Sequence, residues 1–208
     1  MKFLITGGLG VVGSLFARAM LDRGDEVYIV DGGYAKRNRW VRAQLLGGDA
    51  PVSNPAVSSD GRVRVFPFDT SEKDCLQSLE SEIDECDAVL HAGASTGIPH
   101  SAIDPHGDWI QNASGTQRLL EALRRFPKPT IIMSTVKPYR ITAETTARGL
   151  VEDDPLDPDE PYAASKAAAS LLAQAYARSY GIPLTVIRFS NLYGPAPCHG
   201  LRHGWLTS

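Results

Sequence analysis

Hydrophobic residues along this chain fall into short apolar runs that alternate with longer stretches of helical spacing. Strands of a parallel sheet are buried on both faces and read as such continuous runs, whereas an amphipathic helix repeats its apolar positions every three or four residues. The alternation therefore predicts an α/β fold, with a doubly wound parallel sheet and helices on both faces. The predicted strands are 2–6, 26–31, 62–67, 87–92, 129–134 and 183–189, and the predicted helices are 11–23, 71–83, 107–126 and 160–180.

Two segments interrupt this alternation. Residues 34–47 have the spacing of an additional helix after the second strand. Residues 48–61 are rich in proline, serine and glycine and predict a surface loop. The length of 208 residues is enough for one domain with a sizeable core.

Composition excludes several classes of function. The net charge of −3 argues against nucleic-acid binding, and no apolar run approaches the roughly 20 residues that cross a bilayer. The cysteines Cys75, Cys86 and Cys198 lie far apart without a CxxC spacing, which favours a reduced, cytoplasmic protein. His199 and His203 have a metal-like spacing, but no third ligand accompanies them, so no metal site is expected.

A glycine-rich turn follows the first strand directly and leads into a helix. Gly7 would permit the tight turn, Gly10 would let a pyrophosphate approach the backbone, and Gly13 would let the helix pack closely on the strand. The helix opens at Val11 and Val12, where free N–H groups and the helix dipole favour phosphates. The turn therefore predicts a Rossmann-type dinucleotide site, and the alternative is a tight strand–helix turn without a ligand.

Asp31 ends the second strand, about 20 residues beyond the glycines, where a carboxylate accepts hydrogen bonds from both ribose hydroxyls of a dinucleotide. The same charge would repel a 2′-phosphate. The expected cofactor is therefore NAD, although nearby Lys36 and Arg37 leave NADP open.

Tyr162 and Lys166 are four residues apart in a helical segment and therefore share one face. A neighbouring ammonium and the positive nicotinamide ring would favour the phenolate of Tyr162, which would then act as a base toward a sugar hydroxyl. Lys166 would also hold the nicotinamide ribose. Thr135 follows the fifth strand, at the sheet edge where ligands bind, and would hydrogen-bond the same substrate oxygen. These three residues are the predicted catalytic set.

With these motifs the chain resembles the extended short-chain dehydrogenase/reductases, specifically the NAD-dependent epimerase/dehydratase group that acts on nucleotide sugars. The resemblance covers essentially the whole chain. The matching motifs occur in the family's order: TGGLGVVG at 6–13, Asp31, Asp69, HAGA at 91–94, DP at 104–105, NASGTQRLLEAL at 112–123, ST at 134–135, PYAASK at 161–166 and RFSNLYGP at 188–195.

The resemblance implies roles for further residues. It places Asp69 and Thr70 beside the adenine, and Ala92 and Gly93 beneath the cofactor. It places Phe189 near the nicotinamide. On the substrate side, Asn191 would face the substrate's phosphates and Asn112 would stabilise the active-site backbone, or either residue would be an ordinary loop cap.

Departures from the family pattern narrow the choice of reaction. Sugar 4,6-dehydratases carry acidic or polar-acidic residues after the threonine, whereas Val136 and Lys137 stand here, which disfavours dehydration. Thr135, Lys137 and Tyr139 resemble the pattern of CDP-tyvelose (CDP-paratose) 2-epimerases. Pro138 and Arg140 depart from the family, which usually has valine and glycine there.

The first hypothesis is an NAD-dependent nucleotide-sugar epimerase that oxidises a ring hydroxyl transiently. The alternatives are a reductase or dehydrogenase of a non-sugar hydroxyl and a non-catalytic dinucleotide-binding module. Residues 1–190 would form the NAD-binding and catalytic domain, and 191–208 the start of a substrate lobe that is otherwise missing, as in a fragment or truncated product. A homodimer is expected through the alanine-rich helix, with Ala163, Ala164, Ala167, Ala168 and Ala169 at the contact or packed internally.

Overall fold

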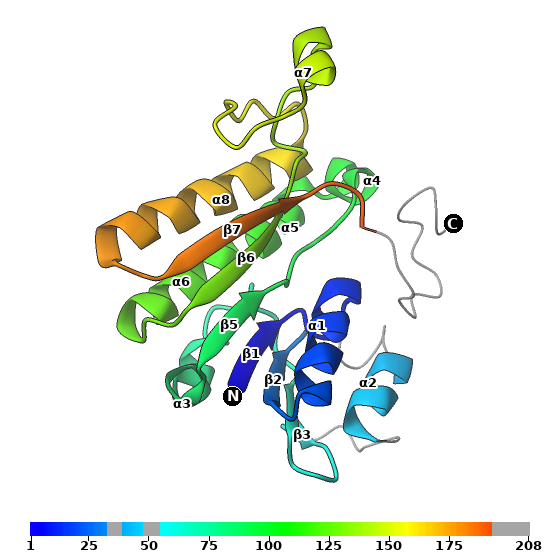
Figure 1. Cartoon of the computed structure of the whole chain (residues 1–208), viewed down its shortest axis with the longest axis vertical. Helices are drawn as coiled ribbons and strands as arrows, with labels where there is room; N and C mark the ends of the chain where they lie inside the picture. Colours follow the sequence, from blue (N-terminus) through cyan, green and yellow to red (C-terminus); the bar gives the residue numbers. More distant parts are fainter. Residues whose placement is uncertain (33–38, 48–54, 193–208) are drawn as a thin grey trace.

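The computed structural model describes residues 1–32, 39–47 and 55–192, and its centre is a seven-stranded sheet (Figure 1). The strand order is β3-β4-β2-β1-β5-β6-β7. Every pairing is parallel except that of the short edge strand β3 with β4. The strands are β1 (Lys2–Thr6), β2 (Glu26–Val30), β3 (Ala56–Val57), β4 (Val63–Phe66), β5 (Ala88–His91), β6 (Thr130–Thr135) and β7 (Leu184–Phe189). This order confirms the predicted doubly wound sheet.

Helices cover both faces of the sheet because successive residues of its central strands are buried on opposite sides. Leu4 packs in one core cluster with Ile83 and Leu119, whereas its neighbour Ile5 packs in another with Ala17 and Leu45. The first face therefore carries α3 (Glu80–Glu85) and α6 (Gly115–Arg125), and the second carries α1 (Val11–Asp22) and α2 (Arg39–Leu46). The long helix α8 (Pro161–Tyr180) lies beside α6 and behind β6 and β7 (Figure 1).

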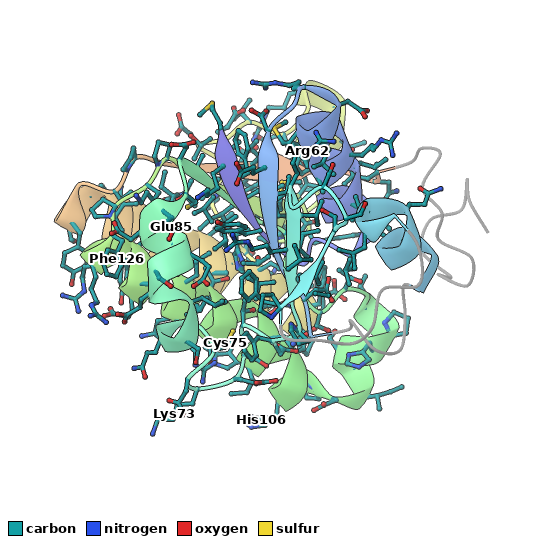
Figure 2. The ribbon with its side chains drawn as sticks, turned by 90° about the horizontal axis from the view of Figure 1, so that it is seen from below. Arg62, Lys73, Cys75, Glu85, His106 and Phe126 are labelled. Carbon is teal, nitrogen blue, oxygen red and sulfur yellow. The ribbon has the colours of Figure 1, made fainter. Side chains whose placement is uncertain are left out.

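Side chains at the sheet's margins tie these layers together. Arg62, just before β4, donates to the carbonyl of Leu21 at the end of α1 at 3.0 Å (Figure 2). On the opposite face Phe126, which follows α6, packs against the core cluster that contains Leu4 (Figure 2). Among the described residues, no helix is long and apolar enough to cross a membrane.

Several predicted helices differ from the observed ones. The segment 107–126 is helical but begins earlier and has three parts: α5 (Pro105–Trp109), the π-helical η2 (Ile110–Ser114) and α6. The helix predicted at 71–83 is wrong at its start, because the chain first turns at Asp69, which accepts from the amide of Ser71 at 2.8 Å. Only the 3₁₀ turn η1 (Gln77–Leu79) and α3 are helical there.

The periodicity missed three short elements. β3 lies inside the predicted loop 48–61, and α4 (Ile98–Ile103) and α7 (Ala143–Arg148) lie in segments without a prediction. A capping box between Thr142 and Thr145 begins α7, and this signal is local, not periodic. Helix α2 confirms the additional helix predicted within 34–47. Some residues named in the sequence predictions lie outside the described residues. They are Lys36, Arg37 and the segment 193–208, which contains Cys198, His199 and His203.

Candidate functional site

The parallel register brings the ends of six strands to one edge of the sheet. Thr6, at the end of β1, pairs with Val30 on β2 and with His91 on β5, so the segments that follow these strands emerge side by side. His91, the last residue of β5, pairs with Ile132 on β6. Strand β6 therefore extends three residues beyond the end of β5, to Thr135. Ligands of doubly wound sheets bind at this carboxyl edge.

The glycine turn is pressed against the segment after β5. Gly7 has a φ of +65°, and a Cβ there would lie 2.6 Å from the amide nitrogen of Gly93. Any other residue at position 7 would therefore be strained and would also push the two loops apart. A Cβ on Gly13 would lie 2.3 Å from the Gly7 carbonyl oxygen, so Gly13 allows α1 to pack on the turn itself.

The first turn of α1 has the features of an anion site. Its N-cap is Gly10, and no side chain of the described residues caps the helix. Apart from Gly10 itself, its two neighbours in the chain and the Gly7 carbonyl oxygen at 3.1 Å, no atom in the described part of the chain would lie within 4 Å of a Cβ at Gly10. The amides of Val11 and Val12 therefore open the helix without a side-chain cap, and the helix dipole adds a favourable potential for negative charge.

Two carboxylates border this turn. Asp31, which follows β2, accepts from the amide of Leu9 at 2.9 Å and so holds the glycine turn against β2. Asp69, after β4, lies close beside Gly32, where an added Cβ would be 2.7 Å from the Asp69 Cβ. Thr70 is buried. The sequence-predicted residues Asp31 and Asp69 therefore belong to neighbouring loops, and their roles toward a ligand stay predictions.

Lys166 ties α8 to β6. Its side chain is 6% exposed, and its Nζ donates to the carbonyl of Met133 at 2.9 Å. Burial lowers the pKa of Lys166 to about 8, and the negative charge of Asp108 opposes this shift. The bond places the first turns of α8, including Tyr162, at the end of β6. Thr135, Tyr162 and Lys166 therefore come from two elements that meet at one place.

The surroundings of Tyr162 within the chain disfavour its phenolate form. Burial raises the pKa of Tyr162, and the charges of Asp108 and Glu160 raise it further. The Lys166 ammonium is bonded to the backbone carbonyl of Met133. The expectation that Lys166 and a positive nicotinamide ring together favour the phenolate stays a prediction. A further positive charge beside Tyr162 would favour the phenolate.

The segment after Thr135 is fixed by Tyr139. The Oγ1 of Thr135 accepts from the amide of Lys137 at 3.3 Å. Tyr139 is buried, and its hydroxyl donates to the carbonyl of Glu152 at 3.2 Å and accepts from Arg188 at 2.8 Å. The Tyr139 hydroxyl therefore holds the chain between β6 and α8, whereas Lys137 is exposed.

The family model described as "NAD dependent epimerase/dehydratase family" matches residues 3–205. The chain belongs to this family. It is 32% identical over 197 residues to a dTDP-glucose 4,6-dehydratase of Mycolicibacterium smegmatis (strain ATCC 700084 / mc(2)155), covering 94% of this chain and 54% of that protein. The chain therefore spans about half the length of the curated relatives it matches.

Solved structures of the family include both kinds of enzyme. The dTDP-glucose 4,6-dehydratase DesIV from Streptomyces venezuelae, with NAD and TYD bound, has a TM-score of 0.76 and 31% identity, covering 94% of this chain and 57% of that one. The UDP-glucose 4-epimerase of Thermus thermophilus, in complex with NAD, has a TM-score of 0.72 and 30% identity, with coverage of 94% and 57%. The resemblance inferred from the motifs is thus confirmed.

Other predicted residues of this epimerase/dehydratase site lie at the same edge or behind it. Phe189 pairs in register with Thr135 and packs on the α1 side of the core. Asn191 is exposed just after β7. Asn112, assigned above to the substrate side, is 1% exposed, and its Nδ2 donates to Asp108 at 3.2 Å and to Ser165 at 3.0 Å. Its amide therefore faces the interior and joins α5 to α8, and its expected role in stabilising the active-site backbone stays a prediction.

Sequence reasoning missed a buried chain of hydrogen bonds centred on His91. Thr116 donates to the Asn112 carbonyl at 2.6 Å, so it accepts from the Nε2–H of His91 at 2.9 Å. The Nδ1 of His91 then accepts from Thr6 at 2.6 Å, and Thr6 accepts from the Gly93 amide. This chain joins the glycine turn to η2. Only the position of His91 at the end of an apolar run, in HAGA, pointed to it.

We expect His91 to make the protein sensitive to acid. Burial lowers the pKa of His91 to about 3, with a smaller contribution from Lys166, whereas an unfolded histidine titrates near 6.5. Between these values the unfolded chain binds the additional proton, so stability falls as pH falls, by up to about 1.4 kcal/mol per pH unit. In His91→Gln this contribution is absent. Urea unfolding at several pH values between 7 and 4 measures the difference in slope.

Thr116→Val is the control for this measurement. It removes one hydrogen-bond partner and keeps the buried imidazole, so its unfolding free energy should be lower at every pH with the slope retained. An identical slope in His91→Gln and the unmodified chain would contradict the assignment of a buried neutral histidine.

Proposed function

We propose that this chain supplies the cofactor-binding and catalytic part of an NAD-dependent nucleotide-sugar epimerase. The observation that carries the proposal is the bond from Lys166 to Met133, which brings Tyr162 to the end of β6 where Thr135 stands. The uncapped first turn of α1 lies at the same edge and fits a diphosphate, and Asp31 fits an adenosine ribose.

The residues would share the reaction as follows. The cofactor NAD would supply a reversible hydride acceptor for a ring carbon and would not be consumed. Tyr162 takes the proton of the hydroxyl at that carbon and gives it back in the return step. Thr135 hydrogen-bonds the same oxygen, and Lys166 fixes the first turns of α8. The positive nicotinamide ring would provide a charge that favours the Tyr162 phenolate.

Dehydration of a nucleotide sugar is the second candidate. Curated relatives at 29–33% identity are dTDP-glucose 4,6-dehydratases, which supports this reaction. The elimination needs an acid and a base next to the oxidised sugar. Val136 and Lys137 follow Thr135 and provide no carboxylate there. Epimerisation needs neither group at that position, so it is the reaction we favour.

Asp31→Asn tests the cofactor assignment. The amide side chain keeps an acceptor for the Leu9 amide but loses the charge that would bind ribose hydroxyls. We expect NAD affinity to fall about tenfold or more, because hydrogen bonds to charged groups contribute about 1.5–3 kcal/mol. NADP should lose less affinity, since its 2′-phosphate no longer meets a carboxylate. Calorimetric titration of both dinucleotides checks this, and an unchanged NAD-to-NADP affinity ratio would remove Asp31 from the ribose site.

Tyr162→Phe tests the catalytic assignment. Loss of the proton-transferring hydroxyl should lower turnover by about 10²–10⁴-fold and leave NAD binding nearly unchanged. Chromatography and mass spectrometry of UDP- and dTDP-sugars incubated with NAD give the measurement. Tyr180→Phe, half exposed at the far end of α8, is the matched control and should retain full activity. Full activity in Tyr162→Phe would overturn the proposed role.

The product distinguishes the candidate reactions in the same assay. A sugar of unchanged mass and altered retention supports the epimerase, and loss of one water from the sugar identifies a dehydratase. Stoichiometric accumulation of NADH identifies a dehydrogenase instead. A chain that binds NAD but converts no nucleotide sugar supports the non-catalytic module.

We also propose a homodimer that packs α8 against a second copy. Ala163, Ala167 and Ala169 are buried within the chain, so internal packing accounts for part of the alanine pattern. The remaining stripe includes Ala168 and Leu171, and Leu171 is 53% exposed. Leu171→Glu should shift the protein toward monomers in sedimentation equilibrium. A monomeric unmodified protein at all concentrations would contradict the proposal.

A further inference from the structure

Asp108 is a buried carboxylate directly behind the first turns of α8. It lies on α5, which packs against α8, and it is 0% exposed. Its Oδ2 accepts from the hydroxyl of Ser165 at 2.8 Å and from the amide of Asn112 at 3.2 Å. A carboxylate out of contact with water is destabilising unless hydrogen bonds and an opposite charge compensate it. The two hydrogen bonds satisfy only one of its oxygens.

The other oxygen lacks a donor. Oδ1 of Asp108 and Oδ1 of Asn112 are both buried, and in the described part of the chain neither accepts a hydrogen bond. Two unsatisfied acceptors in one hydrogen-bonded group create a local negative potential. Lys166 follows Ser165 directly, is itself buried, and uses one of its three N–H groups on the Met133 carbonyl.

We propose that Asp108 is a positioning residue, the buried counter-charge of the Lys166 ammonium, held in place by Ser165 and Asn112. Its importance for turnover rests on the proposed function, in which Lys166 fixes the first turns of α8. Asp108 acts through Lys166 and Tyr162 and does not touch the substrate. Sequence reasoning assigned it no role, because it lies outside every motif singled out there.

The surrounding charges agree with this assignment. Burial lowers the pKa of Lys166 to about 8, and among the described residues Asp108 is the charge that opposes the shift. Asp108 also raises the pKa of Tyr162 and of Glu160, and Lys137 lowers that of Glu160. From β5, His91 stays neutral above about pH 3. On α5 and α4, His106 and His100 are exposed, His106 at the rim of the molecule (Figure 2).

Asp108→Asn tests the proposal with little change of shape. The new side-chain amide keeps one oxygen that accepts from Ser165 and Asn112. Its NH₂ group takes the place of Oδ1, the oxygen that lacked a donor. Without the charge, burial acts on Lys166 unopposed, so its pKa falls below about 8. The titration is followed by ¹H–¹³C NMR of the lysine ε-methylene groups. The chain has six lysines, and the signal absent from Lys166→Met belongs to Lys166.

A midpoint at lower pH in Asp108→Asn than in the unmodified chain is the expected result, and an equal or higher midpoint overturns the proposal. Ser165→Ala is the matched control, because it removes a hydrogen bond to Asp108 and leaves the charge. A shift as large in Ser165→Ala as in Asp108→Asn would assign the effect to packing and would also overturn the proposal.

Circular dichroism establishes that each variant is folded. Should Asp108→Asn fail to fold, Asp108→Ser, which keeps a hydroxyl acceptor without charge, carries the same measurement and the same criterion. The titration requires neither dinucleotide nor nucleotide sugar, so its outcome is separate from that of the proposed function. A shifted Lys166 midpoint in a chain that binds no NAD would overturn the function alone, and an unshifted midpoint in a chain that binds NAD would overturn only the role of Asp108.

Discussion

The site depends on one buried hydrogen bond, from the Lys166 ammonium to the Met133 carbonyl, because it fixes α8 relative to the end of β6. A lysine in the interior is costly, since burial penalises its charged form. The Met133 carbonyl and the charge of Asp108 reduce this cost. Asp108 accepts a hydrogen bond from Ser165 on α8, and Ser165 accepts one from Asn112. Tyr162 is placed one helical turn before Lys166, so its position follows from the same bond.

A second constraint links the glycine turn after β1 to the first turns of α8. Gly7 and Gly93 approach so closely that no Cβ fits between the two loops at position 7. Thr6 and His91, the last residues of β1 and β5, are hydrogen-bonded to each other. His91 also bonds Thr116, whose hydroxyl donates to the Asn112 carbonyl. The same Asn112 bonds Ser165 on α8 through its side chain. The glycine turn and α8 are therefore connected by buried hydrogen bonds. Hydrogen bonds are electrostatically stronger there than in water.

The sequence predicts the main strands and the long helices because their signals are periodic and local. Apolar runs indicated β1, β2, β4, β5, β6 and β7, and the spacing of Tyr162 and Lys166 placed them on one helix face. The sequence could not place Asp108, because a single carboxylate in a helical segment reads as a solvated residue until the packing of α5 on α8 buries it. The burial of Asn112 likewise depends on a tertiary contact, with Ser165, that is 53 residues away in the chain.

The charges around Tyr162 also depend on tertiary packing, and they bear on the proposed reaction. From spacing alone, Lys166 stands one turn from Tyr162 and its charge should favour the phenolate. In the folded chain the ammonium is committed to Met133, while Asp108 and Glu160 act on the phenol with the opposite sign. Burial and these two charges disfavour the phenolate, and a positive group beside Tyr162 would favour it. Under the proposed function that positive group would be the oxidised nicotinamide, so proton removal by Tyr162 would be coupled to the presence of the hydride acceptor.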